Sequence, residues 1–161
     1  MAISITDRMF NLMARHEGGM ARFYRYLAKS FPEHEALFLD IASQETRHAA
    51  WVQRMAQGMG GHSLGLGNTS FSLAALHTAL GKVQESIDLA AMGKMTLLQA
   101  LDLALAFENS PVEREFLNAI SFHGPKGQQL ETLMRLETEQ HRGKLEALRS
   151  KVLAAEAQKA P

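Results

Sequence analysis

The amino-acid sequence predicts an all-α protein, an antiparallel four-helix bundle with a long crossover connection that carries an extra helix. Three observations predict it. Apolar residues recur at helical spacing over four long segments, the connections within the two predicted hairpins are short, and residues 58–95 break this rhythm. We expect a single domain over residues 1–161, with a first hairpin at 4–57, the crossover at 58–95 and a second hairpin at 96–155.

Composition is that of an ordinary globular protein and excludes several kinds of function. Apolar residues make up 46% of the chain and charged residues 21%, and the formal net charge is zero, so nothing attracts nucleic acid or an acidic membrane surface. The absence of cysteine excludes disulfides, iron–sulfur clusters and thiol catalysis. The N-terminus lacks a signal-peptide core and no apolar run has membrane-spanning length, so we expect a cytoplasmic protein with no membrane or nucleic-acid partner.

The first helix is expected from about Ser4 to Ser30. Its inward-facing residues recur at spacings of 3 and 4, and they are Phe10, Met13, Glu17, Met20, Tyr24 and Leu27. Glu17 therefore occupies a core position in the middle of the helix. A glycine weakens a helix by roughly 1 kcal/mol relative to alanine, and we interpret the adjacent Gly18 and Gly19 as a point where another backbone or a ligand approaches closely.

The second helix is expected from about Pro32 to Gln57. Its apolar face comprises Phe38, Ile41, Glu45, His48, Val52 and Met55. Residues three apart lie on the same helix face, so Glu45 and His48 can hold the same object. An ionised group buried alone costs several kcal/mol, so both side chains need a compensating partner.

The second hairpin repeats this arrangement after a weaker crossover helix at about 71–91. The third helix is expected to begin near Thr96, its N-cap, and to be kinked by Pro111. Its inward positions are Leu97, Leu101, Ala104, Glu108, Pro111 and Glu115. The fourth helix, expected at about 128–155, presents Leu130, Met134, Glu137 or Thr138, His141, Leu145 and Leu148.

Acidic and imidazole side chains therefore occupy core positions on all four long helices. Glu17 precedes His48 by 31 residues and Glu108 precedes His141 by 33, so the two hairpins are weak repeats that place these side chains in one layer. Like charges in a buried layer repel one another, and divalent cations convert that repulsion into bonds. We therefore predict a carboxylate-bridged two-metal site in which each imidazole also needs an acceptor for its outer nitrogen.

Three segments of the chain carry a resemblance to a known family: residues 17–28 (EGGMARFYRYLA), 41–49 (IASQETRHA) and 100–108 (ALDLALAFE). The sequence resembles the ferritin-like superfamily and, within it, the rubrerythrin-like proteins. The resemblance implies a di-iron centre, or a centre of another divalent metal, with Glu45 as the bridging ligand. The ligands that it implies are Glu17, Glu45, His48, Glu108 and His141.

The sequence also departs from the rubrerythrin-like pattern. Thr138 stands where the family has a glutamate three residues before the fourth-helix histidine, and Pro111 stands where rubrerythrins often have another glutamate. Glu137, four residues before His141, is a surrogate ligand, and Glu115 is a more remote one. The cysteine-bearing rubredoxin-like domain is missing, so electrons must come from an external donor.

The resemblance implies an oxidoreductase acting on a small oxidant, peroxide or dioxygen, or else an iron-storage or iron-buffering subunit. The alternative is a metal-free bundle that acts as an interaction or dimerisation module, with Glu45 and His48 paired to each other and neutralised by Arg47 or Arg54. Tyr24 is the candidate catalytic residue, as a donor to a ligand or an electron-transfer site, although most such tyrosines are core aromatics. By analogy with the family we expect a homodimer. Other histidines are expected at the surface or in loops: His16, His34, His62, His77 and His123.

Overall fold

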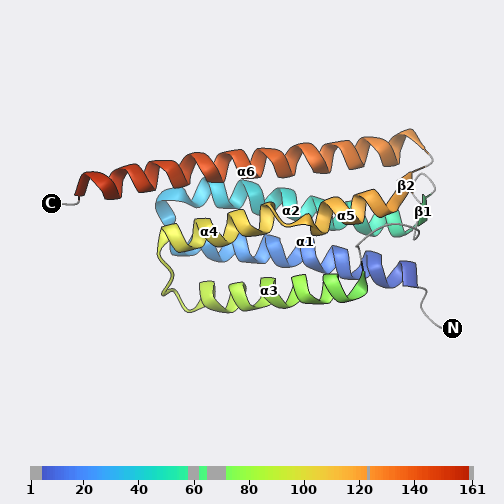
Figure 1. Ribbon diagram of the computed structural model, residues 1–161, viewed down its shortest axis with the longest axis horizontal. Helices are drawn as coiled ribbons and strands as arrows, with labels where there is room; N and C mark the ends of the chain where they lie inside the picture. Colours follow the sequence, from blue (N-terminus) through green and yellow to red (C-terminus); the bar gives the residue numbers. More distant parts are fainter. Residues whose placement is uncertain (1–4, 58–61, 65–71, 123, 160–161) are drawn as a thin grey trace.

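The computed structural model describes residues 5–57, 62–64, 72–122 and 124–159, and this part of the chain is predominantly helical, as predicted (Figure 1). Its helices are α1 (Ile5–Ser30), the 3₁₀ helix η1 (Pro32–His34), α2 (Glu35–Ala56), α3 (Leu73–Ala91), α4 (Leu97–Glu108), α5 (Pro111–Ala119) and α6 (Pro125–Lys159). Two short strands that the sequence analysis did not predict, β1 (His62–Leu64) and β2 (Ile120–Phe122), pair antiparallel, with His62 opposite Phe122. None of the described helices has both the length and the apolar character needed to cross a bilayer.

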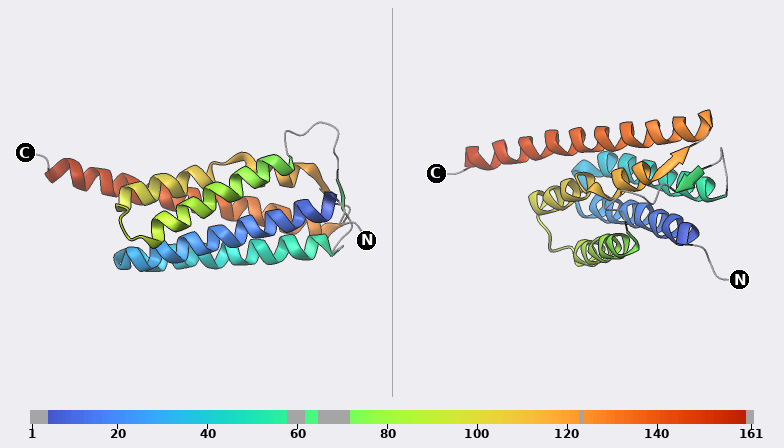
Figure 2. Two further views of the ribbon diagram at one scale, coloured as in Figure 1. Left: turned by 90° about the horizontal axis from the view of Figure 1, so that it is seen from below. Right: turned by 45° about the vertical axis from the view of Figure 1, so that its right-hand side comes forward.

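The long helices run side by side (Figures 1 and 2). Helices α1 and α2 form the expected first hairpin, joined through η1, which begins at Pro32 as the sequence suggested. Helix α3, in the predicted crossover, packs against α1, while α6 packs along α4 and also contacts α2. The middle parts of α1, α2 and α6 and the C-terminal end of α4 come close to one another.

The third predicted helix differs most from expectation, because it is divided in two instead of being kinked. Helix α4 begins after Thr96, whose side chain forms the predicted N-cap and a full capping box with Gln99, and it ends at Glu108. Helix α5 begins at Pro111, and the side chain of its N-cap Ser110 accepts a hydrogen bond from the N–H of Val112. Proline lacks an N–H and has a helical φ, so it suits the first turn of a new helix better than the middle of an old one.

The apolar core is divided into two clusters. One cluster includes Phe10, Met13, Val52, Met55, Phe116 and Met134. The other includes Met20, Phe23, Tyr24, Phe38, Ile41, Leu101 and Leu145. Along α1 and α2 the buried residues between these clusters are polar, and they are His16, Glu17, Gln44, Glu45 and His48. The predicted polar layer thus lies in the middle of the molecule with apolar side chains above and below it.

Candidate metal centre

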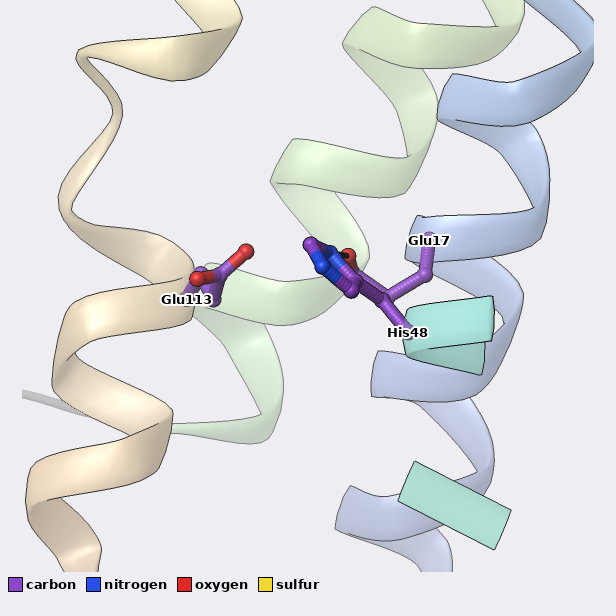
Figure 3. Close-up of side chains that lie close together, drawn as sticks. All are labelled: Glu17, His48 and Glu113. Atoms are coloured by element: carbon purple, nitrogen blue, oxygen red, sulfur yellow. Dashed lines mark ion pairs between the residues drawn. The ribbon is translucent and has the colours of Figure 1, made fainter. Parts of the chain in front are cut away.

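Six acidic and imidazole side chains converge in the polar layer, as two groups of three. The first group is Glu17, His48 and Glu113, and the second is Glu45, Glu108 and His141; within each group, one ligand atom per residue lies within 4.8 Å of the others. Each group therefore offers two carboxylates and one imidazole. Figure 3 shows the first group, with Glu113 of α5 extending toward His48 of α2 and Glu17 of α1.

The structure brings together all five residues that the sequence analysis selected as ligands. They come from α1, α2, α4 and α6, as the two-hairpin arrangement required, and they are Glu17, Glu45, His48, Glu108 and His141. Their role as ligands stays a prediction, since what the coordinates give is their proximity and burial. That proximity has a simple origin: unbroken 3–4 spacing along α1 and α2 keeps them on the face that packs against the other helices.

Glu113 is the residue that sequence reasoning missed. It is the third residue of α5. The sequence analysis instead considered Glu115 of the same helix, which belongs to neither group. The signal was present in the run Asn109-Ser110-Pro111, because a capping residue followed by proline marks a new helix start. Asn109 and Ser110 lie between α4 and α5, so the inward face of α5 does not continue the residue spacing of α4. This shift in spacing places Glu113 on the inward face.

Glu137, the proposed surrogate ligand, lies outside both groups and has a different contact. Its Oε2 accepts from Nε2 of His48 at 2.8 Å, and its Oε1 accepts from Arg47 at 3.0 Å. On the other imidazole, Nε2 of His141 lies 2.9 Å from Oε1 of Gln44. Both acceptors can only accept, so each histidine donates from Nε2 and turns Nδ1 toward the carboxylates. These are the outer acceptors that the sequence analysis required for each imidazole.

Three atoms of the layer are buried without a hydrogen-bond partner among the described residues: Nδ1 of His48, Nδ1 of His141 and Oε2 of Glu17. Such orphaned groups are rare in protein interiors. The Nδ1 of His141 lies 3.0 Å from Oε1 of Glu45, and the Nδ1 of His48 lies 3.5 Å from Oε2 of Glu17. Two atoms bound at about 2.1 Å to one cation, at right angles, are separated by about 3.0 Å. The donor set therefore fits divalent cations of the kind that bind both imidazole and carboxylate.

Burial and mutual charge shift the pKa values of the layer strongly. Burial disfavours the charged imidazole, but the close, negatively charged carboxylates of Glu17 and Glu45 outweigh this effect and raise the pKa of His48 to about 11. The corresponding contacts with Glu108 and Glu45 raise the pKa of His141 to about 9 against the effect of burial. Burial, together with the charges of Glu17 and Glu45, raises the pKa of Glu113 well above its usual value. Protons therefore hold the layer together where cations do not.

Tyr24 and His16 extend the polar layer by hydrogen bonds. The hydroxyl of Tyr24, fully buried, donates to Oε1 of Glu108 at 2.5 Å. His16 was expected at the surface, and that expectation is wrong: it is buried, with Nδ1 3.2 Å from Oε1 of Glu17. His77 is exposed and His34 half-buried, while the side chains of the two remaining histidines outside the layer, His62 and His123, lie beyond the described part of the chain.

Arginine does not neutralise the buried pair in the way that the metal-free interpretation supposed. Arg47 contacts Glu137, on the outer side of His48, and none of the ion pairs found among the described residues joins an arginine to Glu45. The ion pairs that Glu45 forms among the described residues are with the imidazoles of His48 and His141. Burial acts to raise the pKa of Glu45, but these imidazoles hold it below the usual value. No protein-family model, curated protein or solved structure matches this chain, so its function has to be argued from this geometry.

Proposed function

We propose that this chain is a ferritin-like, rubrerythrin-like protein that binds two divalent transition-metal ions, with iron as the expected metal. In this proposal α1, α2, α4–α5 and α6 are the four helices of the bundle, and α3 is the extra helix of the crossover. One observation carries the proposal: both buried imidazoles are fixed from outside through Nε2, and both leave Nδ1 without a hydrogen bond, facing carboxylates. That is how metal-ligating histidines are held in proteins.

The two groups of three residues indicate which side chains would bind each ion. Glu17, His48 and Glu113 would hold one ion, and Glu108 and His141 would hold the other. Glu45 would bridge the two, because its Oε1 approaches His141 at 3.0 Å and its Oε2 approaches His48 at 3.5 Å. Four carboxylates balance the charge of two divalent cations, which removes the repulsion that the bare layer contains.

The chemistry follows from the donor set. When bound, a pair of redox-active ions supplies electrons and Lewis acidity to a small oxidant, either peroxide or dioxygen. The chain itself fixes the ligands and places an apolar cluster on each side of them, so water is excluded from above and below the layer. These 161 residues include no cysteine with which to hold an iron–sulfur or rubredoxin-type centre.

Metal content tests the proposal. Protein purified without chelator and loaded anaerobically with ferrous iron should contain two ions per chain. The Glu45→Gln variant should contain far less, because a neutral amide cannot bridge two cations. Glu146→Gln, on the exposed side of α6, is the matched control and should load like the parent. Full occupancy in Glu45→Gln, or none in the parent, would contradict the proposal.

A metal-free helical module is the second candidate, and one observation favours it. With the pKa of His48 at about 11, the layer can be held by protons and ion pairs alone. Failure to take up ferrous iron would support this candidate. If iron is bound, consumption of peroxide with a surrogate reductant separates an oxidoreductase from a storage or buffering subunit, which would bind iron without turnover.

A further inference from the structure

A cavity of about 270 Å³ leads from the polar layer to the surface beside the junction of α4 and α5. Its inner wall includes Glu17, Glu45 and Glu108, and its outer wall includes the exposed residues Asn109 and Arg114. One water molecule takes up about 30 Å³ in the liquid, so the cavity has room for a guest of several non-hydrogen atoms. It exists because α4 stops at Glu108 and two residues separate it from α5.

The charges that line this cavity are of both signs and are arranged by depth. The carboxylates of the polar layer lie inside, and three arginines and one further glutamate complete the wall: Arg114, Arg135, Arg142 and Glu139. The five lining carboxylates and three arginines carry a formal charge of −2, which protons bound by the layer offset in part when no metal is present. Two divalent cations in the layer would be the largest positive charges at the inner end of the cavity, so metal loading would favour an anion there.

The three arginines differ in how their charge is already used. Arg135 donates to Glu131 and Asn118, and Arg142 donates to Glu139. Arg114 is exposed and takes part in no hydrogen bond or ion pair within the described part of the chain. Arg114 is therefore the cation that is free to meet a guest in the cavity.

We propose that this cavity binds a small monoanion such as a carboxylate, with Arg114 as an anchor, and that it does so more tightly when the layer holds metal. The inference rests on the proposed function and specifies the substrate class of that same site. Binding free energies are linked, so an anion that binds the metal-loaded protein more tightly must tighten metal binding by the same factor. A neutral molecule of the same shape gains nothing from the arginine or from the change of charge.

The test compares acetate with acetamide, its neutral counterpart, by calorimetric titration of cobalt(II)-loaded and metal-free protein at constant ionic strength. Acetate should bind the loaded protein more tightly than the metal-free protein, and acetamide should show no such difference. In Arg114→Gln the acetate Kd should rise by about two- to fivefold, the usual range for one exposed ion pair. Arg22→Gln, an exposed arginine outside the cavity wall, is the matched control and should leave the Kd unchanged.

The outcomes separate the two proposals. If cobalt content is normal in every variant and Arg114→Gln binds acetate like the parent, the anion site is wrong and the metal site stands. Acetate binding of equal strength to the metal-free protein would also overturn the anion site. If the parent takes up no cobalt or iron, the metal site is wrong, and the anion site, which depends on it, fails too.

Discussion

Thr138 of α6 donates a hydrogen bond of 2.9 Å to Oε1 of Glu113 in α5. Thr138 is the position where the sequence analysis noted a glutamate in the rubrerythrin-like pattern, and Glu113 is a carboxylate that the sequence analysis did not select. The threonine thus orients a carboxylate from another helix in place of supplying one. The group of Glu17, His48 and Glu113 obtains its second carboxylate in this way.

This relationship predicts that Glu113→Gln loses one of two bound metal ions. An amide keeps the hydrogen bond from Thr138 but removes the charge that a divalent cation needs, while the group of Glu45, Glu108 and His141 stays intact. Glu115→Gln changes the neighbouring glutamate of the same helix and should retain both ions. Elemental analysis of each variant after ferrous loading measures the number of ions bound per chain. Equal metal content in the two variants would refute the role of Glu113.

The five ligand candidates could be predicted from sequence because periodicity alone determines their face. Along α1 and α2 the 3–4 spacing is uninterrupted, so the side chains of Glu17, Glu45 and His48 follow from the neighbouring core residues. Glu113 could not be found by continuing the stripe of α4, since Asn109 and Ser110 lie outside both helices and alter the phase. A correct prediction required treating Pro111 as a helix start.

Glu137 and His16 show what periodicity leaves open. Adjacent residues on a helix differ in direction by about 100°, so the pattern of α6 did not decide between Glu137 and Thr138, and only the packing of α6 against α2 does. His16 lies beside the inward stripe of α1 and was expected at the surface. It is buried because α1 packs against both α2 and α3, and the sequence did not indicate where α3 would lie.

The hydrogen bond from Tyr24 to Glu108 predicts a loss of stability in Tyr24→Phe. The substitution leaves a buried carboxylate oxygen without its donor, which costs about 1–3 kcal/mol. Tyr26→Phe is the control, because Tyr26 is only half-buried and its hydroxyl has no hydrogen bond to any described residue. In urea unfolding of metal-free protein, the midpoint of Tyr24→Phe should fall with an unchanged slope. A midpoint equal to that of Tyr26→Phe would show that the bond contributes nothing.

The two adjacent glycines of α1 predict opposite effects of alanine. A Cβ at Gly18 meets no atom within 4 Å, so Gly18→Ala should stabilise the helix by about 0.5–1 kcal/mol. A Cβ at Gly19 would lie 2.9 Å from Cγ1 of Val83 in α3, a buried β-branched side chain that cannot easily turn away. Overpacking costs typically about 1–3 kcal/mol, so Gly19→Ala should destabilise the protein despite its better helix propensity.

A double variant supplies the control for that clash. In a Val83→Ala background the Cγ1 methyl group that would clash is absent. Adding Gly19→Ala should then no longer destabilise the protein, and its effect on the free energy of unfolding should approach the stabilisation expected for Gly18→Ala. The interaction free energy from this cycle measures the contact itself. If Gly19→Ala costs the same in both backgrounds, contact with Val83 is not the cause. For the close approach predicted from the sequence, the structure places the side chain of Val83 next to Gly19 and no described atom within 4 Å of a Cβ at Gly18.

The thermal stability of the metal-free protein should fall as pH rises from about 6.5 to 9. The folded-state pKa values of His48 (about 11) and His141 (about 9) exceed the ordinary value of 6.5, so the folded protein binds more protons than the unfolded chain throughout this range. Their contribution is complete below pH 6.5, and that of His141 is lost by about pH 9. The raised pKa values of Glu108 and Glu113 act in the same direction, whereas the lowered pKa of Glu45 matters only in acid.

Metal should abolish most of this pH dependence, because a cation replaces the protons between the imidazoles and the carboxylates. Ferrous loading near pH 7 should accordingly release protons, which titration in buffers of different ionisation enthalpy would count. His77→Gln, which alters an exposed histidine, should keep the full decline of Tm with pH, whereas His141→Gln should make it shallower, with the contribution of His48 remaining. A metal-free protein whose Tm is constant between pH 6.5 and 9 would mean that protons do not hold the layer.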